Sequence, residues 1–170
     1  MNAVEEHRSL APTTVTCIIV TVSDTRTPET DESGLLMKTM LQESGYHVVD
    51  HLIIKDEYEL IRETIHEVSS KHEVQALLFT GGTGISKRDC TYEAVSSLLD
   101  KELTGFGEIF RFLSYEEIGA AAILSRAIGG TVGTTAVFSM PGSRNAVRLA
   151  MEKILIPELR HIVRELNKHS

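Results

Sequence analysis

The sequence has 170 residues, 42% hydrophobic and 24% charged, a length and composition that predict one globular domain. Its 17 lysines and arginines against 24 aspartates and glutamates give a net charge of -7, which argues against nucleic acid as a partner. No apolar run approaches the ~18 residues of a membrane span, and the acidic opening lacks the apolar stretch of a signal peptide, so we expect a cytoplasmic protein without membrane attachment. Cys17 and Cys90 form no CxxC pair, so they indicate neither a zinc site nor a redox motif.

The first half of the chain alternates predicted strands and helices. The β-branched run VTCIIVTV at residues 15–22 predicts a buried strand, and after an exposed loop the apolar residues of 32–44 recur at helical spacing. The strand-like YHVVDHLII, residues 46–54, precedes an amphipathic helix that begins after Asp56. A third buried strand, residues 74–80, leads directly into GGTG.

The second half of the chain continues this alternation. We expect a helix near residues 91–100, a turn at GFGE, and a closely packed helix across EEIGAAAILSRAIGG, residues 116–130, whose side chains are mostly small and apolar. TTAVFSM, residues 134–140, predicts the last strand. Two helices follow it, with Pro157 at a position suited to a first helical turn.

This order of elements predicts the α/β class. Strands that alternate with helices form a mainly parallel sheet covered on both faces, because right-handed crossovers place the helices there. Ligands bind such sheets at the carboxyl ends of the strands, so the loops at those ends are the places to expect function. We expect a single domain at residues 13–170, preceded by a flexible N-terminal tail at residues 1–12.

The segment GGTGISKRD contains the strongest candidate for ligand binding. Its first four residues follow a buried strand directly, and glycine lets a backbone turn tightly and approach a ligand closely. Amides near the following helix favour an anion, so we predict a phosphate-binding loop. A plain glycine turn is the alternative, because the segment matches neither GxxxxGK[ST] nor GxGxxG. The predicted contacts are Gly81, Gly82, Thr83 and Gly84.

Two carboxylates are expected near this loop. Asp89 lies just beyond it and Asp56 closes the loop after the second strand, so the fold can bring both to one edge of the sheet. Together they could hold Mg²⁺, which takes one or two carboxylates plus substrate phosphates. For Asp56 the alternative is helix capping, with Glu59 three residues later. For Asp89 it is a local Asx turn before Thr91.

Two further loops offer polar groups at strand ends. Ser23 and Asp24 open the first loop, where they can contact a polar substrate or serve as ordinary turn residues. Pro141, Gly142 and Ser143 follow the last strand, where they can present amides to an anion or simply begin a helix.

The segments TVSDTRTPETDESG, IIKDEYELI, LLFTGGTGISKRDCTYEAV, GFGEIFRFLSYEEIG, AAILSRAIGG and FSMPGSRNAV, taken in order, resemble the molybdopterin-binding family that includes MogA, MoaB and gephyrin's G domain. The resemblance runs from about residue 13 to the C-terminus. The stretch LSYEEIG and the short, unfused chain make it nearest to the MoaB branch.

The resemblance implies a three-layer α/β/α domain that takes part in molybdenum cofactor biosynthesis. It implies binding of molybdopterin, adenylylation with ATP and Mg²⁺, and a homo-oligomer, a trimer or a hexamer, with other proteins of the pathway as partners. The family's two functional aspartates fall on Asp56 and Asp89. The implied substrate contacts are Ser23, Asp24, Ser125, Arg126, Pro141, Gly142 and Ser143.

Two other functions fit the same residues. A non-catalytic scaffold would bind molybdopterin and release no pyrophosphate. A nucleotide pyrophosphatase, as in CinA-like relatives of this fold, would hydrolyse its substrate without pterin.

Overall fold

The computed structural model describes residues 2–170. Its strands are β1 Thr16–Val22, β2 His47–Ile54, β3 Ala76–Thr80, β4 Lys101–Glu102, β5 Ile128–Val132 and β6 Thr135–Met140. Its α-helices are α1 Ala3–Ser9, α2 Glu32–Glu43, α3 Tyr58–Ser69, α4 Thr91–Leu98, α5 Thr104–Ile118, α6 Arg144–Ala150 and α7 Ile156–Leu166. A 3-10 helix, η1 Gly119–Leu124, follows α5, and a π-helical segment, η2 Met151–Leu155, joins α6 to α7.

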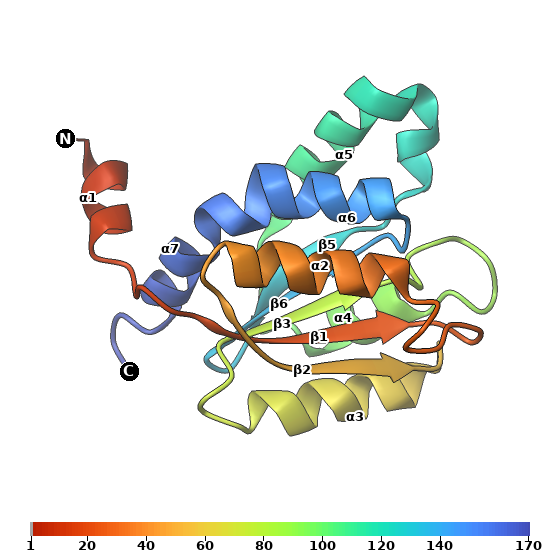
Figure 1. Ribbon diagram of the computed structural model, residues 1–170, viewed down its shortest axis with the longest axis horizontal. Coiled ribbons are helices and arrows are strands. Elements are labelled where there is room, and N and C mark those ends of the chain that lie inside the picture. The colour runs from red at the N-terminus through yellow and green to blue at the C-terminus, as the bar shows by residue number, and fades with distance from the viewer. Residues whose placement is uncertain (1) are drawn as a thin grey trace.

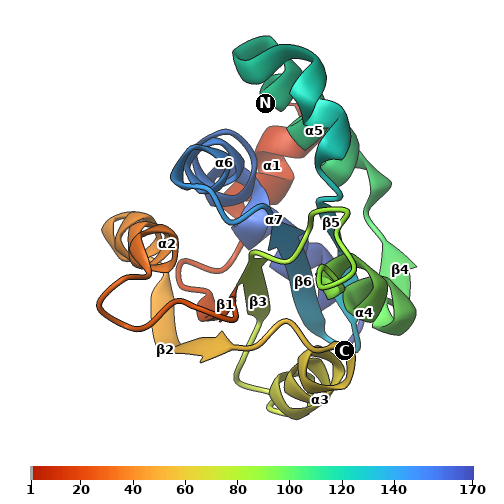
Figure 2. The same cartoon turned by 90° about the vertical axis from the view of Figure 1, so that its right-hand side faces the viewer.

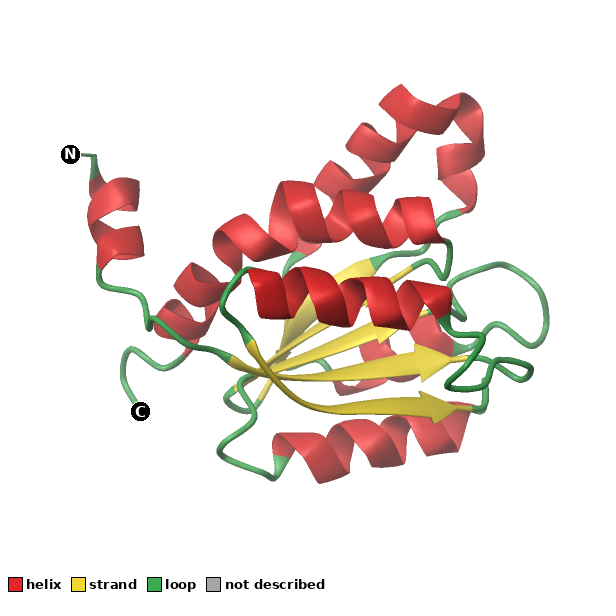
Figure 3. Cartoon of the chain, in the orientation of Figure 1, coloured by secondary structure: helices red, strands yellow, loops and turns green. Residues whose placement is uncertain are grey.

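The six strands form one mixed sheet in the order β2-β1-β3-β6-β5-β4. Strands β2, β1, β3 and β6 are parallel, and β5 runs antiparallel to both β6 and β4. Helices cover both faces (Figures 1 and 3). The predicted α/β class and the three-layer arrangement with a mainly parallel sheet are therefore confirmed.

Each face of the sheet has its own hydrophobic core. On β1, Cys17 and Ile19 point to one face, where Met37 of α2 and Phe110 of α5 belong to the same cluster. Ile18, Val20 and Val22 point to the other face and pack with residues of α3 and α4. This alternation follows from the two-residue period of a strand, and it explains why the β1 segment is apolar throughout.

The region between α4 and β6 differs from the prediction. GFGE is not a turn but the first part of α5, and the expected helix over residues 116–130 is instead the end of α5, η1 and strand β5. Two glycines in this region, Gly107 and Gly129, allow neighbouring segments to pack closely. A Cβ at Gly107 would lie 2.7 Å from the carbonyl oxygen of Ala127, and a Cβ at Gly129 would lie 2.3 Å from the ring of Phe138. Glycine therefore marks tight contacts in this region, which sequence patterns do not distinguish from turns.

The first helix, α1, contacts the last helix, α7. The residues expected to form a flexible tail include helix α1, which has a capping box formed by Asn2 and Glu5. Arg8 of α1 forms an ion pair with Glu158 of α7. The two predicted C-terminal helices are present, with Pro157 in the first turn of α7, but the π-helical segment joins them without a loop. Within residues 2–170, no helix has both the length and the apolar character needed to cross a membrane.

Candidate functional site

The predicted site residues gather where the parallel strands end. Asp24 follows β1, Asp56 follows β2, the glycine loop at residues 81–84 follows β3, and residues 141–143, the PGS loop, follow β6. Figure 2 views the sheet from this edge, with these loops toward the reader. This is the edge at which parallel α/β sheets bind ligands.

A cavity of about 390 Å³ lies between two of these loops, the glycine loop and the PGS loop, and the arm formed by α5 and η1. One side is polar and consists of the glycine loop, Asp89 and the PGS loop. The other side is mainly apolar and comes from α5 and η1, with Phe110, Ile118 and Leu124 among its residues. A larger groove of about 670 Å³ lies between β4 and α7, but it contains none of the predicted site residues.

The backbone of the glycine loop requires glycine at its first two positions. Gly81 has φ +101° and Gly82 has φ +67°, values that residues with a side chain rarely adopt. A Cβ at Gly82 would lie 2.0 Å from the hydroxyl oxygen of Thr91 and 2.8 Å from Oδ2 of Asp56. The Thr91 hydroxyl is buried and has no hydrogen-bond partner in the described chain. The loop is therefore both a tight turn and a close approach of backbone to polar side chains.

Arg126 holds the glycine loop in place from β5's side. Its guanidinium donates hydrogen bonds to the carbonyl oxygens of Thr83, Gly84 and Asp89, and it also pairs with the carboxylate of Glu93. Arg126 does not line the cavity. Its geometry is that of a brace for the loop, which differs from the direct substrate contact that the resemblance implied.

Asp56 is only 7% exposed and lies beneath the glycine loop. Its Oδ1 accepts hydrogen bonds from the backbone N–H of Cys90 at 3.2 Å and from the thiol at 3.0 Å. Oδ2 bonds to no residue that the structure describes. Burial raises the pKa of Asp56 above its ordinary value, against the lowering effect of the Cys90 hydrogen bonds. The proposed capping role of Asp56 is wrong, because α3 begins after Glu57 without a side-chain cap.

Asp89 lines the cavity with one oxygen still available. Its Oδ2 accepts hydrogen bonds from the N–H and the hydroxyl of Ser86, at 2.9 and 2.6 Å. Oδ1 has no partner within residues 2–170. The carboxylate therefore closes a local turn backward to Ser86, not forward to Thr91 as the Asx-turn alternative predicted.

Asp24 connects three of the loops at the edge of the sheet. Arg88, just beyond the glycine loop, binds its carboxylate with two donors at 2.9 to 3.0 Å, and the backbone N–H of Asp56 donates to Oδ1. These hydrogen bonds, that of Arg88 first, lower the pKa of Asp24. Ser23, by contrast, accepts from the amides of Thr25 and Arg26 and forms a turn.

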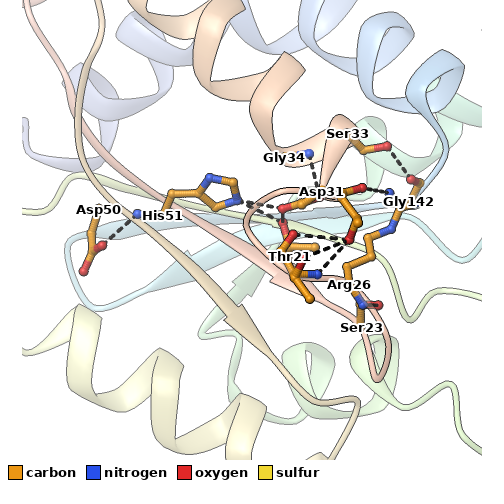
Figure 4. Close-up of polar contacts among 11 residues, drawn as sticks. Thr21, Ser23, Arg26, Asp31, Ser33, Gly34, Asp50, His51 and Gly142 are labelled. Carbon is orange, nitrogen blue, oxygen red and sulfur yellow. Dashed lines mark hydrogen bonds and ion pairs between the residues drawn. The ribbon is translucent and has the colours of Figure 1, made fainter.

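The PGS loop is positioned from helix α2. The hydroxyl of Ser33, a residue only 2% exposed, donates to the carbonyl oxygen of Gly142 at 2.7 Å (Figure 4). Ser143 is the N-cap of α6, since its hydroxyl accepts from the N–H of Ala146. The helix-start interpretation of Ser143 is thus confirmed, and the residue also lines the cavity.

The structure brings most, but not all, predicted contacts together. The cavity is lined by Gly81, Gly82, Thr83, Gly84, Asp89, Ser125, Pro141, Gly142 and Ser143. Four predicted residues lie outside its lining, namely Ser23, Asp24, Asp56 and Arg126. The residues within 2–170 offer no cluster of three or more His, Cys, Asp or Glu side chains for a metal.

Several residues of the site were absent from the sequence prediction. Phe110, Ser114 and Ile118 form the helical wall, and Cys90 and Ser33 hold the loops from below. The interpretation of GFGE as a turn concealed the wall, because it removed the first part of α5. A hydrophobic pattern continued through the two glycines would have revealed that helix.

Comparison with known proteins identifies the family of this chain. Residues 18–161 match the family described as "Probable molybdopterin binding domain". Molybdenum cofactor biosynthesis protein B of Bacillus cereus is 56% identical over 167 residues, covering 98% of this chain and 99% of that protein.

Solved structures agree with this sequence match. A crystal structure of Molybdenum cofactor biosynthesis protein B is similar with a TM-score of 0.90 and 56% identity, covering 94% of this chain and 99% of that one. The tungsten cofactor synthesizing protein MoaB from Pyrococcus furiosus gives a TM-score of 0.82 and 38% identity, covering 92% and 99%. The chain therefore belongs to the molybdopterin-binding family.

Proposed function

We propose that this protein acts in molybdenum cofactor biosynthesis as a molybdopterin adenylyltransferase that uses Mg-ATP. Family membership and the names of the relatives support the role in the pathway. The observation that carries the enzymatic proposal is the cavity itself, in which a loop of backbone amides and a carboxylate with a free oxygen face an apolar wall.

The two sides of the cavity suit the two parts of each substrate. The glycine loop and the PGS loop offer backbone amides to phosphate oxygens, and the wall of α5 and η1 offers apolar contact to a planar ring. Ser125 lines the cavity, and its buried hydroxyl has no partner among the residues described. A bound ligand can supply the missing hydrogen bond.

The residues present also fit Mg²⁺. Asp89 Oδ1 and Asp56 Oδ2 are carboxylate oxygens without partners in the described chain, and such oxygens are the ligands this hard cation prefers. When bound, Mg²⁺ neutralises charge on the phosphates. Two carboxylates are enough for a cation that takes its other ligands from substrate phosphates and water.

The chemistry requires no covalent enzyme intermediate. The terminal phosphate oxygen of molybdopterin forms a bond to the α-phosphorus of ATP, and the bond from that phosphorus to the bridging oxygen breaks to release pyrophosphate. The chain's own contribution is alignment of the two phosphates by the loop amides and stabilisation of the developing charge. Arg126 and Ser33 keep the two loops in position for this alignment.

Pyrophosphate release from Mg-ATP, with and without molybdopterin, tests this function. We expect release by the wild type that depends on pterin, and a loss on the order of a hundredfold in Asp89→Asn, which keeps the side-chain shape but removes the charge. The exposed Glu73→Gln serves as the matched control and keeps full activity. Undiminished turnover in Asp89→Asn would contradict the role of Asp89, and release without pterin would indicate a pyrophosphatase.

One observation favours the scaffold as a second candidate. Asp56 lies outside the lining of the cavity and has one oxygen engaged by Cys90. A protein that only binds pterin needs no second carboxylate. Pterin binding without pyrophosphate release would establish the scaffold and refute the enzyme.

We also propose that the protein forms a homo-oligomer. Three large apolar residues spaced three apart on α5, away from the cavity wall, are more than half exposed, namely Ile109, Phe112 and Tyr115. This helix and η1 project from the body of the molecule (Figure 1). Contiguous exposed apolar surface of this kind marks a site of association.

A further inference from the structure

A second polar cluster lies outside the candidate site, beneath helix α2. It consists of Thr21 at the end of β1, Asp31 at the N-terminus of α2, and His51 on β2 (Figure 4). Asp31 is fully buried. Its Oδ2 lies 2.5 Å from the Thr21 hydroxyl and 2.9 Å from Nε2 of His51. None of the three residues lines the cavity described above.

The contacts of Asp31 determine which ring nitrogen of His51 is free. Thr21 donates its hydroxyl proton to Oδ2, and the N–H of Gly34 donates to Oδ1 at 3.0 Å. The short contact from His51 to the same carboxylate requires the proton to be on Nε2. Nδ1 has no partner among the residues described, and Figure 4 shows it on the side of the ring away from Asp31.

The cluster is held rigidly. A Cβ at Gly34 would lie 2.2 Å from Asp31, 2.4 Å from His51 and 2.6 Å from Thr21. The three side chains therefore pack directly on the backbone of α2, at a position where only glycine fits. Such packing fixes the orientation of the imidazole, as a binding group requires.

His51 faces a groove of about 600 Å³ whose charged side chains are all basic. Arg26, Lys38 and His51 line it, with Leu35 and Ile53 as apolar contacts and no acidic residue in the lining. Lys38 is half-buried and makes no ion pair with any residue from 2 to 170. Among the acids of the preceding loop and of α2, Asp24 pairs with Arg88 and Glu32 with Arg144. Glu29 does not line the groove, and its carboxylate accepts a hydrogen bond from the side chain of Thr27, which does.

We propose that this groove is a second ligand site, which binds a phosphate monoester with a compact apolar group. Two cationic side chains, Lys38 and Arg26, match the acceptor oxygens of a phosphate, although one nitrogen of Arg26 also donates to the carbonyl oxygen of Thr30. The imidazole of His51 lies in the same lining, and Leu35 and Ile53 contact the apolar group. Asp31 holds the imidazole in place from behind through its contact with Nε2. The site shares no lining residue with the cavity of the proposed reaction, so it does not depend on that function.

Phenyl phosphate is a suitable probe for this site. Titration into protein labelled with ¹⁵N-histidine, with the His51 signals assigned from His51→Gln, should shift the His51 ring nitrogens in a saturable manner. Lys38→Gln should weaken binding roughly tenfold, the effect of losing one charge-assisted hydrogen bond. The remote, exposed Lys168→Gln should bind as the wild type does.

Two further experiments distinguish binding in this groove from binding in the candidate catalytic cavity and from a general effect of salt. Gly84→Ala, which alters only the candidate catalytic cavity, should leave the His51 titration unchanged, so failure of the proposed function does not affect this result. Sodium chloride at matched ionic strength should not reproduce the shift, and benzoate should bind more weakly than phenyl phosphate. An unsaturable response, an equal response in Lys38→Gln, equal binding of benzoate, or the same shift with chloride would overturn the proposal.

Discussion

The absence of a Cβ atom at Gly84 leaves the space that the Asp89 carboxylate occupies beside the glycine loop. A Cβ at Gly84 would lie 2.6 Å from Oδ2 of Asp89, the oxygen that accepts both hydrogen bonds from Ser86. The φ of Gly84 is not in the left-handed region, so an alanine there is tolerated by the backbone. Gly84 is therefore needed to leave room for a carboxylate.

Gly84→Ala should lower pterin-dependent pyrophosphate release on the order of a hundredfold, because it displaces the Asp89 carboxylate. The free energy of unfolding should change by no more than about 1 kcal/mol, since the added Cβ meets only the carboxylate end of the Asp89 side chain, which can move. Gly105→Ala is the matched control, because its Cβ meets nothing within 4 Å and the residue is helical. Equal activity of the two variants would show that Asp89 does not need its observed position.

Asp56 should make stability depend on pH. Folding raises the pKa of this carboxyl, chiefly through burial, so the folded chain holds the proton more tightly than the unfolded chain does. Its contribution to the free energy of unfolding is therefore present below the ordinary pKa of 3.8 and is lost as pH rises through the raised value. Asp56→Asn cannot ionise and escapes this loss.

Chemical denaturation of Asp56→Asn and wild type across acid to neutral pH measures this effect. The stability of the variant relative to wild type should increase with pH and then level off above the raised pKa. The exposed Glu73→Gln provides the reference for a carboxylate in solvent. A difference between Asp56→Asn and wild type that is constant with pH would refute the linkage.

At the scale of elements, helix α2 controls the PGS loop across a long sequence separation. The Ser33 hydroxyl donates to Gly142, and a Cβ on Gly142 would lie 3.3 Å from Cα of Gly81. The N-terminus of α2 therefore contacts the PGS loop, and the PGS loop in turn contacts the glycine loop. A change at Ser33 reaches the cavity although the residue does not line it.

Ser33→Ala should lower the free energy of unfolding by about 1 kcal/mol, the net value of a typical hydrogen bond. It should also raise KM for molybdopterin, because the PGS loop is no longer fixed. Ser97→Ala is the control, since its hydroxyl bonds only to Ala94 within the same helix. A KM for Ser33→Ala equal to that of the control would show that α2 does not position the loop.

The predicted elements are present where a helical spacing or an apolar run continued without interruption. The segments of α2 and α3 show helical spacing of apolar residues, and those of β1, β2, β3 and β6 are short β-branched or apolar runs; each element is present near its expected bounds. The arm of α5 and η1 and strand β5 were not found. Their glycines make room for Ala127 and Phe138, residues brought near only by the folded chain.

At the scale of the whole molecule, the exposed stripe on α5 should determine assembly. Phe112 is 63% exposed at the centre of that stripe. A stable interface buries roughly 1,200 Å² or more, so the loss of its central apolar side chain should be costly. A glutamate there would also add to the net charge of -7 on each copy.

Phe112→Glu should shift the protein from a trimer or hexamer toward the monomer in sedimentation velocity experiments. Val49→Glu is the control, because Val49 is an exposed apolar residue on the edge strand β2, away from the arm. A monomeric wild type, or an assembly unchanged by Phe112→Glu, would contradict association through α5.

The sequence by itself determined the α/β class, the edge of the sheet where the candidate site lies, and the presence there of the glycine loop with Asp89, because these depend on local patterns and on residues close together in the chain. Only the tertiary structure decided that Asp56 bonds to Cys90, that Arg126 braces the loop, and that α5 forms the apolar wall. Those contacts join residues far apart in sequence. Their partners are selected by packing distances, which a pattern along one chain does not contain.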